Sequence, residues 1–385
     1  MITINDKNEC CGCEACAQIC PTKCISFTED EEGFRYPNVN TQHCINCGQC
    51  ENTCPIINIQ PHINQNLACY AVKHKNTEVR ISSSSGGLFS AIAEFVLNRN
   101  GVVFGVAFSN EYEAEYIEAL NKDQLCQLRG SKYIQAHLNN IFKKVKQHLT
   151  KGTIVLFSGT ACYINSLKLY LKKDYENLFT IDIICHSVPS PKVWKQYLNE
   201  TCASLSWDKS SISRIQFRSK IEGWHNSYFV IENKNGDNYK IPYNRNPFIK
   251  GFLHGLYSRP CCNKCLFKTK RMSDLTTGDF WGIEKIIPEF DDGLGVSAVI
   301  SHTEKGQYLI KNSNLETIQT NFEIIEKENP YISVSCNENP MRSAFFKTEG
   351  TVEKKVKKIL HKPIYLRIYN RLIKNFKCLR KINIF

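Results

Sequence analysis

The chain alternates short apolar runs with stretches in which apolar residues recur at helical spacing. Apolar runs typical of strands buried on both faces occupy residues 102–108, 154–157, 178–184 and 296–301. Helical spacing occurs at residues 88–97, 161–171 and 191–198. Because strand and helix alternate, we predict an α/β body over residues 67–335.

A β-hairpin is predicted inside this body. Residues 228–232 and 239–241 are strand-like and enclose the turn signal Asn235-Gly236-Asp237. Strands joined by so short a turn pair antiparallel.

The segment 340–385 is predicted as a basic helical tail. From residue 352 onward, apolar residues lie among lysines and arginines, and Pro363 interrupts the pattern. Such a helix can rest on anionic lipid or on an acidic partner, or it can pack its apolar side on the body. Residues 353–385 hold eleven Lys/Arg and one Glu, so they supply most of the formal charge of +12. Because the positive charge is local, we do not predict a nucleic-acid partner.

The composition is that of a globular protein with an unusual number of cysteines. A length of 385 residues with 42% hydrophobic residues fits two or three domains. No apolar stretch is long enough for a membrane span, and residues 1–10 lack signal-peptide features. We therefore expect a cytoplasmic protein, with peripheral contact to the inner face of the membrane if the tail binds lipid. Ten of the twenty cysteines precede residue 55, which indicates a metal-dense module rather than a disulfide scaffold.

The first sixty residues carry a duplicated cysteine motif. Two C-x2-C-x2-C-x3-C-P repeats comprise Cys10, Cys13, Cys16 and Cys20, then Cys44, Cys47, Cys50 and Cys54. In two-cluster ferredoxins the fourth cysteine of each repeat binds the other cluster. The repeats therefore predict an α+β ferredoxin-like domain over residues 1–60 with two 4Fe-4S clusters, one on Cys10, Cys13, Cys16 and Cys54, the other on Cys44, Cys47, Cys50 and Cys20. Zinc sites also use C-x2-C pairs, but they need neither the third cysteine nor the paired C-x3-C-P.

Two further cysteines and four apolar residues lie near these motifs and are not expected to bind iron. Cys11 and Cys24 fall outside the repeats and are predicted not to bind iron. Ile19, Ile25, Phe27 and Ile45 are expected to cover the sulfurs.

Two junctions before predicted helices suit a phosphate group. The run Ser82-Ser83-Ser84-Ser85-Gly86-Gly87 leads into the helix at Leu88, and Ser158-Gly159-Thr160 follows a strand. Hydroxyl groups and backbone N–H groups at a helix N-terminus bind anions, although an ordinary serine cap is the alternative.

A second cysteine group lies in the body. Cys261, Cys262 and Cys265 form half a metal site by spacing, for which Cys162 or Cys185 could supply further ligands. The alternative is a group of thiols without a metal.

Five runs in the body resemble the beta subunit of coenzyme F420 hydrogenase and dehydrogenase, a family that also includes plant 7-hydroxymethyl chlorophyll reductase. They are residues 84–90, 130–133, 156–162, 185–191 and 277–282. The resemblance implies an FAD-binding iron-sulfur protein. It also implies FAD contacts from Ser84, Ser85, Gly86, Gly87, Gly130, Ser131, Lys132, Tyr133, Ser158, Gly159 and Thr160.

The same resemblance implies a third 4Fe-4S cluster on Cys185, Cys262 and Cys265. The chain departs from the family pattern at Cys261, at Ala161 and at Ser187, where a small non-ligand residue, proline and glycine are usual. The first departure leaves the choice between Cys261 and Cys262 open.

The predicted function is that of an FAD- and 4Fe-4S-dependent oxidoreductase. An external ferredoxin or flavodoxin exchanges electrons with the clusters, and the clusters exchange them with FAD. The resemblance leaves two classes of organic acceptor, an F420-like molecule or a polysaccharide-pathway substrate. His186 and Lys132 are predicted as catalytic residues, either as proton donor or as the positive charge beside the reduced flavin. A structural histidine and a surface or phosphate-binding lysine are the alternatives.

A competing hypothesis is a non-catalytic subunit that relays electrons to a partner redox subunit. The two phosphate-type loops favour the enzyme, because a relay does not need them.

Overall fold

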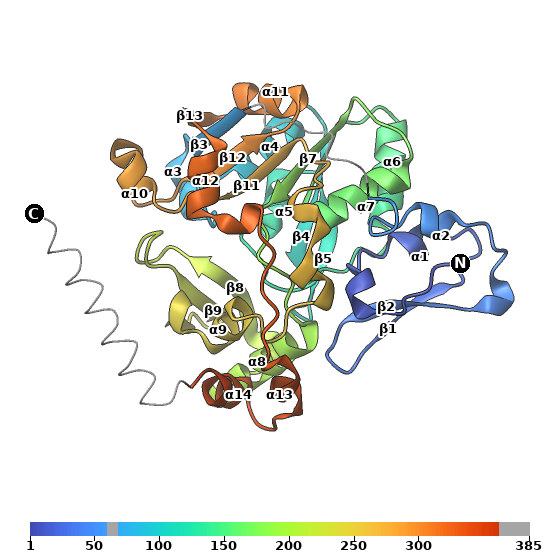
Figure 1. Ribbon diagram of the computed structural model, residues 1–385. Coiled ribbons are helices and arrows are strands. Elements are labelled where there is room, and N and C mark those ends of the chain that lie inside the picture. The colour runs from blue at the N-terminus through green and yellow to red at the C-terminus, as the bar shows by residue number, and fades with distance from the viewer. Residues whose placement is uncertain (60–67, 362–385) are drawn as a thin grey trace, which may run out of the picture.

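The centre of the protein is an eight-stranded mixed sheet, seen in a computed structural model that describes residues 1–59 and 68–361 (Figure 1). The strand order is β13-β3-β12-β11-β7-β6-β4-β5. The strands are β3 (Ala68–His74), β4 (Val102–Phe108), β5 (Ala114–Ala119), β6 (Val155–Gly159), β7 (Leu178–Ile183), β11 (Leu275–Asp279), β12 (Ser297–Ser301) and β13 (Leu315–Thr320). Strands β4, β6, β7 and β11 run parallel, so their carboxyl ends meet at one edge of the sheet.

Helices cover both faces of this sheet, which explains the continuous apolar runs in the sequence. On β4 and β6, Val103 and Leu156 pack into one core, while Phe104 and Phe157 pack into the other. The helices of the body are α3 (Thr77–Ile81), α4 (Leu88–Leu97), α5 (Lys122–Leu128), α6 (Ile141–Thr150), α7 (Ala161–Leu171), α10 (Ile283–Ile286), α11 (Glu304–Asn312) and α12 (Phe322–Glu328). The predicted mixed α/β body is thus confirmed.

A smaller antiparallel sheet is inserted between β7 and β11. It consists of β8 (Ile212–Ser219), β9 (Tyr228–Asn233) and β10 (Asn238–Pro242), and α8 (Pro191–Ser204) and α9 (Pro247–Leu253) belong to the same insertion. The predicted hairpin is confirmed, and Gly236 adopts the positive φ of 91° that its tight turn requires. Helix α8 is longer than predicted because Thr201 and Cys202 continue its buried side.

The described part of the predicted tail packs on this insertion. Helix α14 (Val352–Leu360) lies beside α8 and α9, with Val352 and Val356 buried, and α13 (Arg342–Lys347) lies beside α14. For residues 352–360 the body-packing alternative is therefore the one observed. The predicted lipid contact also involved residues 362–385, which lie outside the described residues.

The N-terminal module consists of α1 (Ala15–Ile19), β1 (Ile25–Glu29), β2 (Arg35–Val39) and α2 (Gln49–Asn52), and it lies beside α6 and α7 (Figure 1). The cysteine repeat is also a backbone repeat. Gly12 and Asn46 precede the second cysteine of each motif, Glu14 and Gly48 follow it, and all four have positive φ. The chain therefore turns in the same way around each cysteine triplet.

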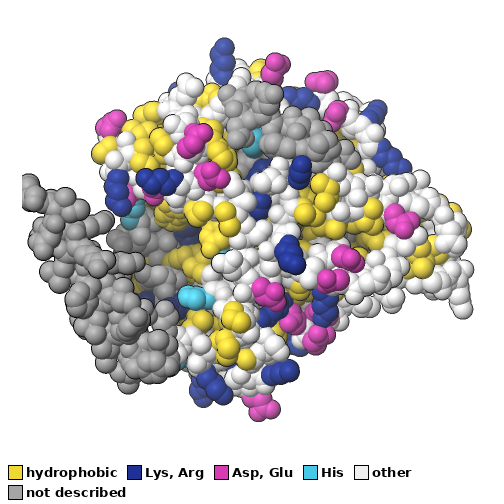
Figure 2. All heavy atoms as spheres, in the orientation of Figure 1, with side chains coloured by type: hydrophobic (Ala, Val, Ile, Leu, Met, Phe, Trp, Pro, Cys, Tyr) yellow, Lys and Arg dark blue, Asp and Glu magenta, His cyan; other side chains and the backbone are white. Residues whose placement is uncertain are grey.

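The surface is electrostatically mixed. In the space-filling view, basic and acidic side chains are interspersed over the body, whereas the module at the right shows few charged side chains (Figure 2). Among residues 1–59 and 68–361, no helix is long and apolar enough to cross a membrane.

Candidate cofactor and electron-transfer site

The eight motif cysteines line two separate hollows in the N-terminal module. One is lined by Cys10, Cys13, Cys16 and Cys54, together with Cys11, and the other by Cys44, Cys47, Cys50 and Cys20, together with Cys24. The motif cysteines of each hollow are the set that the exchange of the fourth cysteine predicts. Backbone N–H groups of Gly12 and Ile2 donate to the sulfurs of Cys10 and Cys50, both at 3.4 Å. Such bonds favour the thiolate form that binds iron.

The apolar residues expected over the sulfurs lie near the cysteines but differ in burial. Ile25 is buried beside the cysteines, and Ile19 and Phe27 are partly buried. Ile45 lines the hollow of Cys44, Cys47, Cys50 and Cys20, but its side chain is 64% exposed and its loop also carries the exposed Cys47.

The body thiols gather where the module meets the sheet. Cys162 at the start of α7, Cys185 after β7, and the pair Cys262 and Cys265 are electrostatic neighbours of one another. Burial raises the pKa of Cys265 to about 12 and also raises that of Cys185. The pKa of Cys262 is raised first by its hydrogen bond with the Cys261 thiol and then by burial. Such thiols are protonated without a bound cation.

Cys261 has neighbours on two sides. It lies beside the buried Arg259 and Tyr36, and its thiol is also in hydrogen-bond contact with that of Cys262. Cys336, which the sequence analysis did not single out, is buried and its thiol lies 3.6 Å from the carbonyl oxygen of Cys262. The ammonium group of Lys268 donates to the carbonyl oxygens of Cys185 and Tyr331 and places a positive charge next to this group.

A cavity of about 530 Å³ opens at the carboxyl ends of β6, β7 and β11. The carboxyl edge of a parallel sheet is the usual place for a ligand in α/β proteins. All three predicted flavin loops meet here. The predicted residues that line the cavity are Ser84, Ser85, Gly87, Gly130, Ser131, Lys132, Tyr133, Ser158, Gly159 and Thr160, together with His186.

Gly86 is the exception among the predicted flavin contacts, because it anchors the loop instead of lining the cavity. Its N–H donates to the hydroxyl of Ser297 at 3.0 Å, and an added Cβ would lie 2.3 Å from the carbonyl oxygen of Val72. Ser85 is anchored similarly, through a hydroxyl bond to Val296 at 3.0 Å.

Two helices begin at the cavity without a side-chain cap. Gly87 precedes α4 and Thr160 precedes α7, and neither start receives a capping hydrogen bond from its own N-cap side chain. Uncapped N-termini present free N–H groups and a partial positive charge, the arrangement that binds phosphate.

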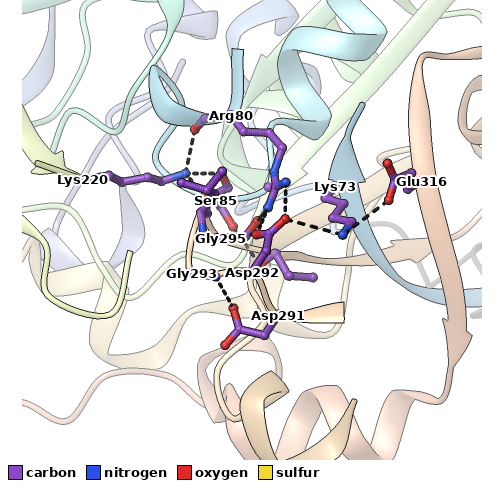
Figure 3. Close-up of polar contacts among 12 residues, drawn as sticks. Lys73, Arg80, Ser85, Lys220, Asp291, Asp292, Gly293, Gly295 and Glu316 are labelled. Carbon is purple, nitrogen blue, oxygen red and sulfur yellow. Dashed lines mark hydrogen bonds and ion pairs between the residues drawn. The ribbon is translucent and has the colours of Figure 1, made fainter. Parts of the chain in front are cut away.

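The serine loop, residues 82–87, is held in place by side chains that do not line the cavity (Figure 3). Lys220 donates to the carbonyl oxygens of Arg80 at 2.7 Å and of Ser85 and Leu294, each at 2.6 Å. Burial lowers the pKa of Lys220 to about 7. Arg80 makes a bidentate pair with Asp292, so both ends of the loop are tied to the turn before β12.

The remaining cavity wall is aromatic and carries one arginine. Tyr133, Tyr243, Phe252 and Trp281 line it, and Arg218 from β8 lies over the rings of Tyr243 and Trp281. Sequence reasoning missed Arg218. Trp281 and Asp279 stood within a run that carried the family resemblance, but no role followed from it.

The two predicted catalytic residues, Lys132 and His186, both line the cavity, and burial lowers the pKa of each. The Lys132 ammonium group donates to the carbonyl oxygens of Gln127 and Arg129, both at 2.9 Å, and burial lowers its pKa to about 7. Burial, assisted by Lys268, lowers the pKa of His186 to about 4, so its imidazole is neutral near pH 7.

The module and the cavity share a wall. Gln135 and Tyr163 both line the cavity, and both donate to the carbonyl oxygen of Gly12, at 3.3 and 3.4 Å. The Cys11 thiol is in hydrogen-bond contact with those of Cys13 and Cys162, so it lies between a module cysteine and a body cysteine.

Several known proteins are similar to this chain. Ketoisovalerate oxidoreductase subunit VorC of Methanothermobacter marburgensis is 38% identical over 63 residues, which are 16% of this chain and 80% of that protein. An uncharacterized protein of Methanocaldococcus jannaschii is 24% identical over 206 residues, 45% of this chain and 56% of that protein. The chain spans 80% of the length of VorC and 56% of that of the uncharacterized protein. It spans 34% of the length of a further relative, an uncharacterized polyferredoxin-like protein of Methanocaldococcus jannaschii.

Among solved structures, a chain of the F420-reducing [NiFe] hydrogenase complex from Methanosarcina barkeri is similar, with a TM-score of 0.48 and 16% identity over 71% of this chain and 91% of that chain.

Family models account for most of the chain. The 4Fe-4S dicluster domain matches residues 9–57. The N-terminal and C-terminal models of the coenzyme F420 hydrogenase/dehydrogenase beta subunit match residues 69–143 and 152–327, which together are more than half of the chain. The chain therefore belongs to the coenzyme F420 hydrogenase/dehydrogenase beta subunit family.

Proposed function

We propose that this protein is an iron-sulfur flavoprotein oxidoreductase that passes electrons between ferredoxin-type clusters and an FAD in the 530 Å³ cavity. One observation carries the proposal. The turn from Ser158 to Cys162 borders the cavity at one end, and at the other end its cysteine contacts Cys11 of the module. A cofactor in the cavity is thereby a neighbour of the thiols that lead to the ferredoxin motif.

The ligand sets follow from the two hollows and the body thiols. Cys10, Cys13, Cys16 and Cys54 would bind cluster I, and Cys44, Cys47, Cys50 and Cys20 cluster II. A third cluster would use Cys185, Cys262 and Cys265. We assign its fourth ligand to Cys162, because Cys162 is the electrostatic neighbour that Cys185, Cys262 and Cys265 share.

The cavity residues fit FAD by their chemistry. Hydroxyl groups of the serine loops and the uncapped starts of α4 and α7 suit the pyrophosphate, and the aromatic wall suits a flat ring. FAD, when bound, exchanges two electrons with an organic molecule and single electrons with clusters. The protein's own part would be to hold the cofactor through these loops and to exclude water with Tyr133, Tyr243 and Phe252.

The alternative function is a relay subunit without its own substrate. The family name and the name of VorC both describe subunits of larger oxidoreductases, which favours a partner redox subunit. Reduction of a small acceptor by the isolated chain supports the enzyme, whereas activity only with an added partner supports the relay. An F420-like molecule and a polysaccharide-pathway substrate are the two acceptor classes to assay. An external ferredoxin or flavodoxin remains the proposed electron donor.

Anaerobic purification followed by iron, sulfide and flavin analysis tests the proposal. Two clusters give about eight irons and three give about twelve. Cys262→Ser should lower the iron content by about four, while its matched control Cys261→Ser should not. Iron without stoichiometric flavin would refute the flavoprotein.

A further inference from the structure

We propose that Arg218 is the hydrogen-bond donor to an oxygen at the edge of a planar redox ring in the cavity, and that it stabilises the negative charge this ring acquires on reduction. The inference rests on the proposed function and assigns a role that neither Lys132 nor His186 fills.

Arg218 is fixed in place before any ligand binds. Its Nε donates to the hydroxyl of Ser227 at 3.1 Å, and its Nη1 donates to Asp279 at 2.8 Å. The guanidinium lies 5.2 Å from the ring centre of Tyr243 and 5.1 Å from that of Trp281. Because the group is held by two hydrogen bonds and two rings, a ligand gains its donor without ordering a flexible side chain.

One nitrogen of this guanidinium has no partner among the residues the structure describes. The Nη2 atom is buried and makes no hydrogen bond, although the whole side chain is only 4% exposed. Leaving a buried donor unpaired is costly, so the missing partner of this nitrogen needs an explanation. Arg218 lines the cavity, which makes a ligand bound there our candidate for the missing acceptor.

The other cations that line the cavity in the described part of the chain are already engaged. Lys132 donates to two carbonyl oxygens. Arg129 donates to Ser90, to Glu94 and to the thiol of Cys126. Lys220 does not line the cavity, and it donates to three carbonyl oxygens. Among these cavity cations, Arg218 is thus the one with a nitrogen atom that makes no hydrogen bond.

The surroundings of Arg218 select a ring oxygen over a phosphate. Asp279 already balances the charge of Arg218, and Trp281 and Tyr243 present flat faces rather than N–H groups. A carbonyl oxygen on a conjugated ring is a weaker acceptor than a phosphate and suits this partly neutralised donor beside aromatic walls.

Reduction changes the charge at that oxygen. When a flavin ring accepts two electrons and one proton, one negative charge remains, shared with its carbonyl edge. Arg218 stays protonated at every relevant pH, so it gives no proton and acts only through its charge and its hydrogen bond. The strengthened bond favours the reduced ring.

Flavin spectroscopy of the full-length holoprotein tests the proposal. Sulfite is the probe. Its sulfur donates an electron pair to form a bond to a nitrogen of the flavin ring, and the adduct carries on its carbonyl edge the same negative charge as the reduced ring. In Arg218→Gln we expect flavin to remain bound, sulfite to bind at least tenfold more weakly, and the flavin potential to become more negative. Asp279→Asn removes the opposing charge and should shift both measurements in the opposite direction. Arg214→Gln is the matched control, because Arg214 lies exposed on the same strand and does not line the cavity; it should leave both measurements unchanged.

The outcomes separate the two levels of the proposal. Wild-type protein without flavin contradicts the proposed function. Wild-type protein with flavin, but with sulfite affinity and potential unchanged in Arg218→Gln, overturns the role of Arg218 alone. If Arg218→Gln loses its flavin, Asp279→Asn decides: tighter sulfite binding supports the role and weaker binding overturns it.

Discussion

Replacing Arg259 should lower the reduction potential of cluster I, the cluster proposed on Cys10, Cys13, Cys16 and Cys54. Arg259 is completely buried. It donates to the carbonyl oxygens of Cys10 at 2.7 Å and Arg35 at 3.0 Å, and to the amide oxygen of Gln135 at 2.9 Å. In the described part of the chain it forms no ion pair with a carboxylate; the groups that raise its pKa are led by Cys10 and Cys261. A charge so placed needs a negative partner, and a 4Fe-4S cluster with four thiolates supplies one.

The size of the effect follows from Coulomb's law. A positive charge about 7 Å from the added electron, at an effective dielectric constant of about 20, stabilises the reduced cluster by about 2 kcal/mol. For a one-electron couple this is about 90 mV. Arg259→Gln removes the charge but can retain some of the hydrogen bonds, so we expect cluster I to shift negative by up to this amount. Cluster II should not shift, because none of its cysteines is among the groups that act on Arg259.

The assay is a potentiometric titration of anaerobic holoprotein followed by electron paramagnetic resonance. Arg342→Met is the matched control. Arg342 is also buried and lies 6.0 Å from the ring centre of Phe34, compared with 5.5 Å for Arg259, but Glu32 neutralises it. Arg342→Met should therefore loosen the same region without changing the reduction potential of cluster I or cluster II. Equal shifts of both clusters, or no shift in Arg259→Gln with iron retained, would refute the reasoning.

Three further predictions follow from individual residues. Cys54→Ser should remove cluster I, a loss of about four irons by chemical analysis, whereas Cys24→Ser, outside the motif, should lose none. Gly12→Ala should slow electron exchange between clusters and flavin in stopped-flow traces with both cofactors retained, because Gly12 has a φ of 69° and the new Cβ would lie 2.1 Å from Gln135; wild-type rates would contradict this. The folded-state pKa of His186, about 4, lies below its unfolded value, so the wild type loses stability between pH 6.5 and 4, by up to about 3 kcal/mol. His186→Gln should show a shallower decline of the melting temperature over this range, and an equal decline would contradict the assignment.

Local patterns in the sequence predicted much of the fold. The four buried apolar runs became β4, β6, β7 and β12, because strands covered on both faces have no polar side to interrupt them. The hairpin was predictable from its turn residues. One strand that was missed has a mixed composition: β8 carries Ser213, Arg214 and Gln216, so its pattern resembles a loop.

The candidate site was predictable only where its residues form contiguous motifs. The cysteine repeats and the serine loops are local signals, and they converge as expected. Arg218 gave no signal, because its partner Asp279 is 61 positions away and the pair forms only once the inserted sheet folds back on the end of β11. Cys336 and Arg259 were missed as partners for the same reason: tertiary contacts, and not spacing, give them their neighbours.

The junction between β6 and α7 explains why cavity and thiols can act together. Ser158, Gly159 and Thr160 line the cavity, while Cys162, two residues later, contacts Cys11 of the module. The hydroxyl of Thr160 lies 3.1 Å from the sulfur of Cys162. Because one short turn borders both sites, their separation is fixed by bonded geometry and by the strand that precedes the turn. Electron exchange between the proposed cavity cofactor and the proposed body cluster would therefore need no domain movement, and the proposed reductant would have to reach only the exposed side of the module around Cys47.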